Sequence, residues 1–172
     1  MIMKHLFLFA VLVSAFFACS GNQKQANTAA APIALEQLLA TADKQLNDTV
    51  TVVGYVTHTC KQSGKKCFIV GESKGISLRV EAQGEIQTFS PELIGSKLAI
   101  TGALKEEQLS KESIDEMENT VKLKQTNETA TVEACETEMS NISDMRKWMK
   151  EHNKDYYSIY YMDGYKYEVL DK

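Results

Sequence analysis

The alternation of apolar and polar residues between Thr49 and Leu104 restricts the fold of this chain more than any other feature. Residues 49–60 read TVTVVGYVTHTC, which is rich in β-branched residues and has the period of two that is typical of a strand. Three shorter segments of the same kind follow, at 67–70, 76–82 and 97–104. Gly54 and Gly102 interrupt the first and last strands, where a glycine permits a sharp bend. Short, bent strands in this order favour a sheet that closes into a small barrel.

Helical periodicity appears on both sides of the predicted sheet. Apolar residues spaced by three and four predict one helix over 34–46 and another over 135–152. The acidic segment 106–118 is also expected to be helical. The Thr-, Lys- and Glu-rich segment 121–133 is expected to be a mobile loop, because it has no apolar stripe.

The C-terminal region is rich in tyrosine and has the pattern of a β-hairpin. Two strand-like runs, 156–162 and 165–170, are separated by Asp163–Gly164, a dipeptide that is typical of a tight turn. The expected fold class is therefore α+β: a small β-barrel with an N-terminal helix, a C-terminal helix and a Tyr-rich β-hairpin.

Three stretches of the barrel region resemble the OB-fold part of Bacteroidetes lipoproteins. They read VTVVGYVTHTC, GKKCFIV and LIGSKLAITGAL. The resemblance implies an OB-like barrel over 34–109, with 110–172 as a helical and Tyr-rich extension packed on the same domain. It carries no activity with it. The last strand of such a barrel would have to come from the Tyr-rich C-terminal segment.

Residues 1–18 have the pattern of an export signal. Lys4 precedes the uncharged run LFLFAVLVSAFF at 6–17, which is shorter than the roughly 20 residues that a bilayer-spanning helix needs. Ala18 then precedes Cys19, and this junction resembles the lipobox of bacterial lipoproteins, in which the cysteine is lipidated. The alternative is an ordinary secretory signal cut near Ala18, which would leave Cys19 as a free thiol.

Residues 19–33 are expected to hold the lipidated cysteine and a flexible tether, because the segment is polar, Ala-rich and without periodicity. The expected location is the bacterial cell envelope, with the membrane as a partner through the lipid. No acidic run follows Cys19. Its absence favours a periplasm-facing anchor over surface export.

The charge and the motifs of the chain restrict its function. The formal net charge is −4, and this makes a nucleic-acid partner unlikely, because general nucleic-acid binding needs a basic surface. The sequence has no Ser/His/Asp arrangement, no phosphate-binding loop and no placed pair of carboxylates, so we do not expect an enzyme. The expected function is a binding module for an envelope protein or a small ligand, and nucleic-acid binding by OB analogy is the weakest alternative.

Cysteines provide the sharper alternative, a metal-binding or thiol-redox protein. His58 and Cys60 are two residues apart, so an unbroken strand places both side chains on one face. Cys67 follows a short turn, and in a hairpin it can face Cys60 at a distance that permits a disulfide. A zinc or copper site with His58, a redox pair and inert thiols are the other interpretations. Cys135 could complete such a site, although Met residues at helical spacing around it indicate a core.

Basic and aromatic side chains are the other candidates for a ligand surface. Those of the first turn and nearby strands are Lys61, Lys65, Lys66 and Arg79, and those of the C-terminal region are Tyr160 and Tyr165. OB folds commonly bind ligands with such loops and strands. Phe68 is expected in the core.

Overall fold

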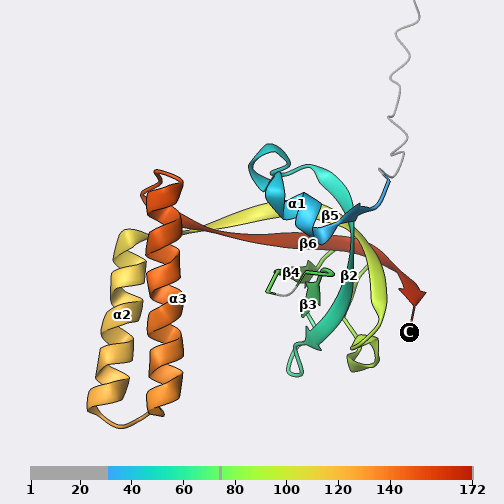
Figure 1. Cartoon of the computed structure of the whole chain (residues 1–172). Helices are drawn as coiled ribbons and strands as arrows, with labels where there is room; N and C mark the ends of the chain where they lie inside the picture. Colours follow the sequence, from blue (N-terminus) through green and yellow to red (C-terminus); the bar gives the residue numbers. More distant parts are fainter. Residues whose placement is uncertain (1–30, 74, 172) are drawn as a thin grey trace, which may run out of the picture.

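A closed five-stranded barrel forms the body of the molecule in a computed structural model that describes residues 31–73 and 75–171 (Figure 1). Its strands are β2 (Thr49–Thr59), β3 (Lys66–Val70), β4 (Ser77–Ala82), β5 (Lys97–Ser110) and β6 (Tyr156–Asp171). They lie in the order β2-β3-β4-β6-β5, and β5 pairs with β2 to close the barrel. Only β4 and β6 run parallel within this ring. The predicted α+β fold with a small OB-like barrel is confirmed.

Short elements cover the barrel between and before its strands. They are β1 (Ile33–Ala34), which pairs in parallel with β2, the helix α1 (Leu35–Ala40), and the 3-10 helices η1 (Ala42–Lys44) and η2 (Pro91–Leu93). Leu35 and Leu38 of α1 are fully buried. The N-terminal helix predicted over 34–46 is therefore present in two parts, and its apolar stripe packs against the barrel core.

The interior of the barrel holds the side chains that the alternation assigns to one face. The buried aliphatic residues of the strands are Val50, Val52, Val56, Ile69, Leu78, Val80, Leu98, Ile100, Leu104 and Met162. They come from all five strands, so the core exists only when the ring is complete. Burial of these side chains is the main stabilising term of the barrel.

The predicted C-terminal hairpin is wrong, because β6 is one continuous strand of 16 residues. Gly164 lies opposite Gly102 of β5, in the region where β5 shifts its register. A Cβ atom on Gly164 would come within 2.7 Å of the side chain of Val80. The glycine therefore marks a close approach between strands and not a turn. β6 supplies the fifth strand of the barrel from the segment expected as an extension.

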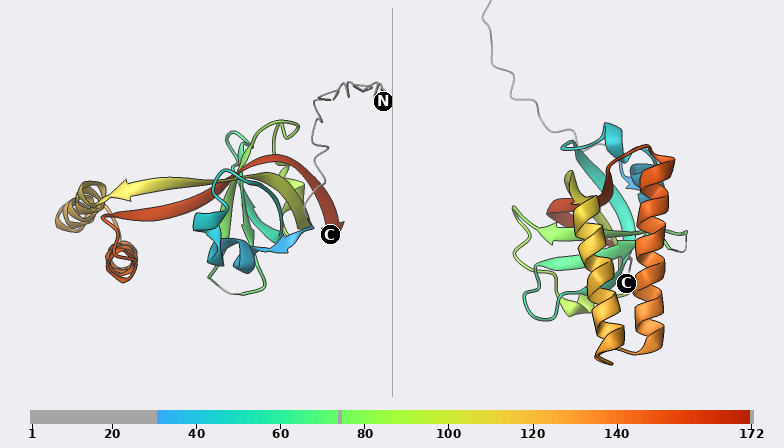
Figure 2. Two further views of the ribbon diagram at one scale, coloured as in Figure 1. Left: turned by 90° about the horizontal axis from the view of Figure 1, so that it is seen from above. Right: turned by 90° about the vertical axis from the view of Figure 1, so that its left-hand side faces the viewer.

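A two-stranded ribbon continues β5 and β6 beyond the barrel. Residues 105–110 of β5 pair with residues 156–161 of β6 in an unbroken antiparallel register. Seen from above, this ribbon carries the helices well away from the barrel (Figure 2). Within residues 31–73 and 75–171, no other pair of strands links the barrel body to the helices.

An antiparallel pair of helices, α2 (Lys111–Thr126) and α3 (Val132–Glu151), caps the ribbon. The prediction of a helix over 106–118 and a loop over 121–133 is wrong at both boundaries. Residues 106–110 pair as strand, and the Ser110 hydroxyl accepts a hydrogen bond from the Ser113 amide, which starts α2 there. Val121, in the expected loop, is 2% exposed and packs on α3.

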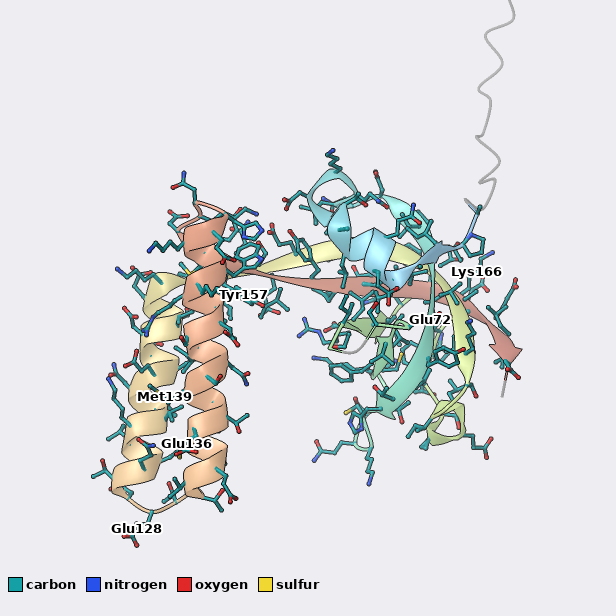
Figure 3. The ribbon with its side chains drawn as sticks, viewed as in Figure 1. Glu72, Glu128, Glu136, Met139, Tyr157 and Lys166 are labelled. Carbon is teal, nitrogen blue, oxygen red and sulfur yellow. The ribbon has the colours of Figure 1, made fainter. Side chains whose placement is uncertain are left out.

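The helical hairpin has a hydrophobic core of its own, separate from that of the barrel. Its buried members are Ile114, Val121, Cys135, Ile142 and Met149. Tyr157 joins this core from the start of β6 and meets Trp148 edge-on, with ring centroids 5.2 Å apart. Figure 3 shows Tyr157 where the ribbon meets α3, and Glu128 at the far tip of the hairpin. In the part of the chain that the structure describes, no helix is long and apolar enough to cross a membrane.

Candidate functional site on the outer face of the barrel

A β-bulge near the end of β2 decides which side chains reach the outer face. The register of β2 against β3 shifts between Val56 and His58. Val56 and Thr59 are both buried, so the strand holds one more residue between them than strict alternation allows. The condition of an unbroken strand, on which a shared face of His58 and Cys60 depended, is therefore not met, and the imidazole of His58 is exposed.

Five side chains form a row across the outer face of the barrel, one from each strand. The pairing registers join His58 to Phe68, Phe68 to Arg79, Arg79 to Tyr161 and Tyr161 to Lys105. We call these residues the cross-strand row. Directly paired residues of neighbouring strands point to the same side of a sheet, so all five point outward, and the row follows the curve of the closed barrel.

Ring contacts hold the cross-strand row together. The rings of His58 and Phe68 lie 5.9 Å apart at an interplanar angle of 45°. The guanidinium carbon of Arg79 lies 4.8 Å from the centre of the Tyr161 ring, within the range of a cation–π interaction. The row therefore combines aromatic and cationic groups, and these contacts join His58 to Phe68 and Arg79 to Tyr161.

Acidic side chains surround and partly neutralise the cations of this face. Arg79 lies 3.1 Å from the carboxylate of Glu81 and donates a hydrogen bond of 3.0 Å to that of Glu107. Lys66 is 3.4 Å from Glu81. The face has mixed charge, and its main cation already has two acidic partners.

Burial raises the pKa of the Tyr161 phenol, and the carboxylates of Asp163 and Glu81 raise it further, while Arg79 opposes them. The phenol therefore stays protonated at neutral pH and remains a hydrogen-bond donor. Lys105, at the end of the row, donates a hydrogen bond of 2.8 Å to the side-chain oxygen of Asn47.

The predicted cysteine site is not assembled. Cys60, Cys67 and Cys135 are all free thiols, so the expected Cys60–Cys67 disulfide is absent. Cys67 lies in the barrel core and Cys135 in the core of the helical hairpin, which are different clusters. Within residues 31–73 and 75–171, no three His, Cys, Asp or Glu side chains gather as a metal site would require. These positions do not fit the expected zinc or copper ligands.

The two barrel thiols have opposite electrostatic surroundings. The Ser63 hydroxyl donates to the sulfur of Cys60 at 3.3 Å, and this bond, with backbone amides of the turn, lowers the Cys60 pKa to about 7. Burial raises the pKa of Cys67 to about 12. Cys60 is half-buried and reactive in principle, whereas Cys67 is an inert core residue.

The remaining predicted surface residues lie in different places. Lys66 and Arg79 lie on the same face as the cross-strand row. Lys65 donates to the carbonyl of Gln87 at 2.8 Å, which fastens the first turn to the loop after β4. Tyr160 faces the barrel core and donates a hydrogen bond of 2.6 Å to Asp43.

Lys61 is exposed in the first turn. Tyr165 lies in the second half of β6, within the barrel, and is 37% exposed. Neither belongs to the cross-strand row. Cys19 and the export signal lie outside the described residues.

Local sequence patterns do not identify three members of the row. Phe68 was expected in the core, but its neighbours Cys67 and Ile69 are the buried ones, so strict alternation along β3 would have placed it outside. Tyr161 and Lys105 are revealed only by the strand pairing, which no local pattern specifies.

Comparison with known proteins adds little to this geometry. No protein-family model matches the chain, and no curated protein matches it. Among solved structures, the chain is similar to a putative aspartyl-tRNA synthetase from Leishmania major Friedlin, with a TM-score of 0.41 and 14% sequence identity. The match covers 88% of this chain and 23% of the other, so the chain spans about a quarter of that protein's length.

Proposed function

We propose that this chain is a binding module of the bacterial envelope, anchored by a lipid on Cys19, which binds an oligosaccharide on the cross-strand row. The single observation that carries the ligand site is the row itself: aromatic and cationic side chains that point outward from neighbouring strands of an OB-like barrel. Outer strand faces and adjoining loops of OB folds bind oligosaccharides and oligonucleotides.

The charge of the face favours a sugar over a nucleic acid. Sugars present apolar ring faces, which suit Phe68 and Tyr161, and hydroxyl groups, which can bond to carboxylates and guanidinium groups alike. A polyanion would have to displace Glu81 and Glu107 from Arg79 and would meet a chain of net negative charge.

An NMR titration tests the ligand class. The chain is titrated with an oligomer of N-acetylglucosamine and, separately, with a single-stranded oligothymidylate at physiological salt. We expect the sugar to shift the amide resonances of β3, β4 and the middle of β6, and to do so in a saturable way. Phe68→Ala should weaken binding about tenfold, because a stacked ring contributes roughly 1–1.5 kcal/mol.

Tyr55→Ala is the matched control, because Tyr55 is an exposed aromatic residue of β2 outside the row. Its removal should leave the affinity unchanged. Saturable binding of the oligothymidylate, lost in Phe68→Ala, would contradict the sugar proposal and support a nucleic-acid partner. Equal losses in both variants would show that the row is not the site.

The lipid anchor rests on the sequence of the N-terminal region and has its own test. The chain is expressed in a bacterium, and the membrane fraction is analysed by intact mass. We expect a mature protein that begins at Cys19 and carries the mass of three acyl chains with glycerol. Cys19→Ser should abolish this mass. A wild-type product that is cut near Ala18 and carries no lipid would support an ordinary secreted protein.

A further inference from the structure

The helical hairpin and the barrel have separate hydrophobic cores, so apolar packing does not fix the angle between them. What joins the two bodies is the ribbon of residues 105–110 and 156–161, which holds the hairpin away from the barrel (Figure 2). A two-stranded ribbon has a single row of paired residues and can twist and bend more than a wider sheet. The hairpin therefore keeps one orientation only if a second contact ties it to the barrel.

Lys154 makes that second contact. It lies in the turn between α3 and β6, and its backbone amide donates a hydrogen bond of 2.9 Å to the Met149 carbonyl, which fixes the turn on the end of α3. Its amine lies 3.4 Å from the Asp43 carboxylate of η1, on the barrel side. Within the two described ranges, no other hydrogen bond or ion pair joins residues 111–155 to residues 31–104. We call the Lys154–Asp43 contact the latch.

Aromatic rings and a hydroxyl group hold the Lys154 amine in place. It lies 5.3 Å from the centre of the Trp148 ring of α3 and 5.1 Å from that of the Tyr156 ring of β6, both within the range of a cation–π interaction. The Ser158 hydroxyl of β6 is 3.5 Å away. One cation thus contacts the hairpin, the ribbon and the barrel at the same time.

The barrel side of the latch is anchored without Lys154. The Tyr160 hydroxyl donates a hydrogen bond of 2.6 Å to Asp43, and Tyr160 itself packs against the barrel core. The Asp43 carboxylate therefore stays in position when the lysine is absent. Its side chain is 64% exposed, so water and salt weaken its attraction to Lys154.

We propose that the latch holds the hairpin in one of two orientations, and that its release lets the hairpin swing on the ribbon as a body. The separate core of the hairpin allows this motion without unfolding. An exposed ion pair shifts an equilibrium by about fivefold at most, so the latch favours one orientation without excluding the other. The inference does not depend on the ligand of the cross-strand row.

A distance measurement between the two bodies tests the latch. The chain carries Cys60→Ser, which removes the half-exposed thiol, and nitroxide labels at Glu92→Cys of η2 and Glu136→Cys of α3, both exposed positions. Pulsed electron paramagnetic resonance should give one main distance and a minor second one. Lys154→Met should raise the ratio of the second population to the first about fivefold.

Lys150→Met is the matched control, because it removes an exposed lysine from the end of α3 and should leave the distances unchanged. Asp43→Asn breaks the same ion pair from the barrel side, touches neither helix and should reproduce the effect of Lys154→Met. The double variant should change the distances no more than either single variant, since both remove one contact. High salt should enlarge the second population in the wild type and have little effect in Lys154→Met.

Distances in Lys154→Met that equal those of the wild type would overturn the proposal. A change in Lys154→Met without one in Asp43→Asn would overturn it as well, because Lys154 would then act through Trp148 and Tyr156 within its own turn. Circular dichroism checks that each variant keeps its helices. If Lys154→Met loses helical signal, Asp43→Asn decides the outcome.

Discussion

At the scale of single residues, the chemistry of a side chain depends on its immediate surroundings. Cys60 and Cys67 are close in sequence, yet one lies in a turn of backbone amides and the other in the barrel core. Their pKa values, about 7 and about 12, differ because the first thiolate receives hydrogen bonds and the second would be desolvated.

This difference predicts selective thiol chemistry at Cys60. In the folded protein, iodoacetamide should modify Cys60 with a rate that rises through a midpoint near pH 7, because the thiolate is the nucleophile. Ser63→Ala should move the midpoint to higher pH, since the Ser63 hydroxyl is the largest cause of the lowered pKa. Mass spectrometry after timed quenching measures both rates.

Cys67 and Cys135 provide the internal control for that experiment. Both are buried, so they should remain unmodified until denaturant is added. Rapid native-state modification of Cys67 would contradict its place in the barrel core.

The sequence could predict the faces of individual residues only where alternation is unbroken. The burial of Leu78 and Val80 and the exposed position of Ser77 follow the period of two along β4. The change of face between Val56 and His58 could not be predicted, because a bulge depends on the partner strand and leaves no local signal in a β-branched segment.

At the scale of elements, a polar contact ties the N-terminal helical segment to the ribbon. Tyr160 of β6 donates a hydrogen bond of 2.6 Å to Asp43 of η1, and Lys154 lies 3.4 Å from the same carboxylate. The Tyr160 hydrogen bond is the main cause of a lowered Asp43 pKa. An aspartate with a lowered folded-state pKa contributes stability that is present above its usual pKa and is lost as the pH falls through the folded value.

Tyr160→Phe should therefore destabilise the protein more at neutral pH than in acid. We expect a loss of only about 1 kcal/mol in the free energy of unfolding at pH 7, because the Asp43 carboxylate is largely exposed and water weakens its hydrogen bond to Tyr160. The loss should shrink as the pH falls below the usual range of an aspartate and through the lowered folded-state pKa of Asp43, where this carboxylate becomes protonated. Urea unfolding at pH 7 and at a series of acid pH values measures it.

Tyr165→Phe serves as the comparison, because Tyr165 is exposed and belongs to the same strand. It should change the stability little at any of these pH values. A Tyr160→Phe effect that keeps its neutral-pH size throughout the acid range would show that packing, and not the Asp43 bond, explains the loss.

Element boundaries were predicted well for the barrel strands and poorly for the C-terminal part of the chain. Strands at 49–60, 67–70, 76–82 and 97–104 agree with β2 to β5 over most of their lengths, because each has one buried face. Residues 121–133 lack an apolar stripe of their own, so α2 depends on packing against α3, which local propensity does not report.

At the scale of the whole molecule, two hydrophobic cores share one ribbon. The barrel core and the helical-hairpin core have no residue in common, and Leu109 and Tyr157 are the first residues of the ribbon that pack with the helices. Each core should therefore unfold with its own free energy.

Removal of the helical hairpin should leave the barrel folded. Gln108 and Ser158 are directly paired, so replacement of residues 109–157 by Asn-Gly should convert the ribbon into a tight hairpin. We expect the amide resonances of β2, β3 and β4 to keep their positions, and a single cooperative unfolding transition in urea to remain.

Truncation before Tyr165 should have the opposite result, although it removes far fewer residues. It deletes the half of β6 that pairs with residues 97–101 of β5, and it opens the barrel core to water. The truncated chain should lack dispersed amide resonances. A folded truncation, or an unfolded barrel without the hairpin, would show that the division into two cores is wrong.

The place of β6 in the ring also sets the order of events during biosynthesis. β6 is made after the other four strands of the ring and has to insert between β4 and β5. A nascent chain cannot complete its barrel until residues 156–171 have left the ribosome, so shorter copies stay open and accessible to chaperones.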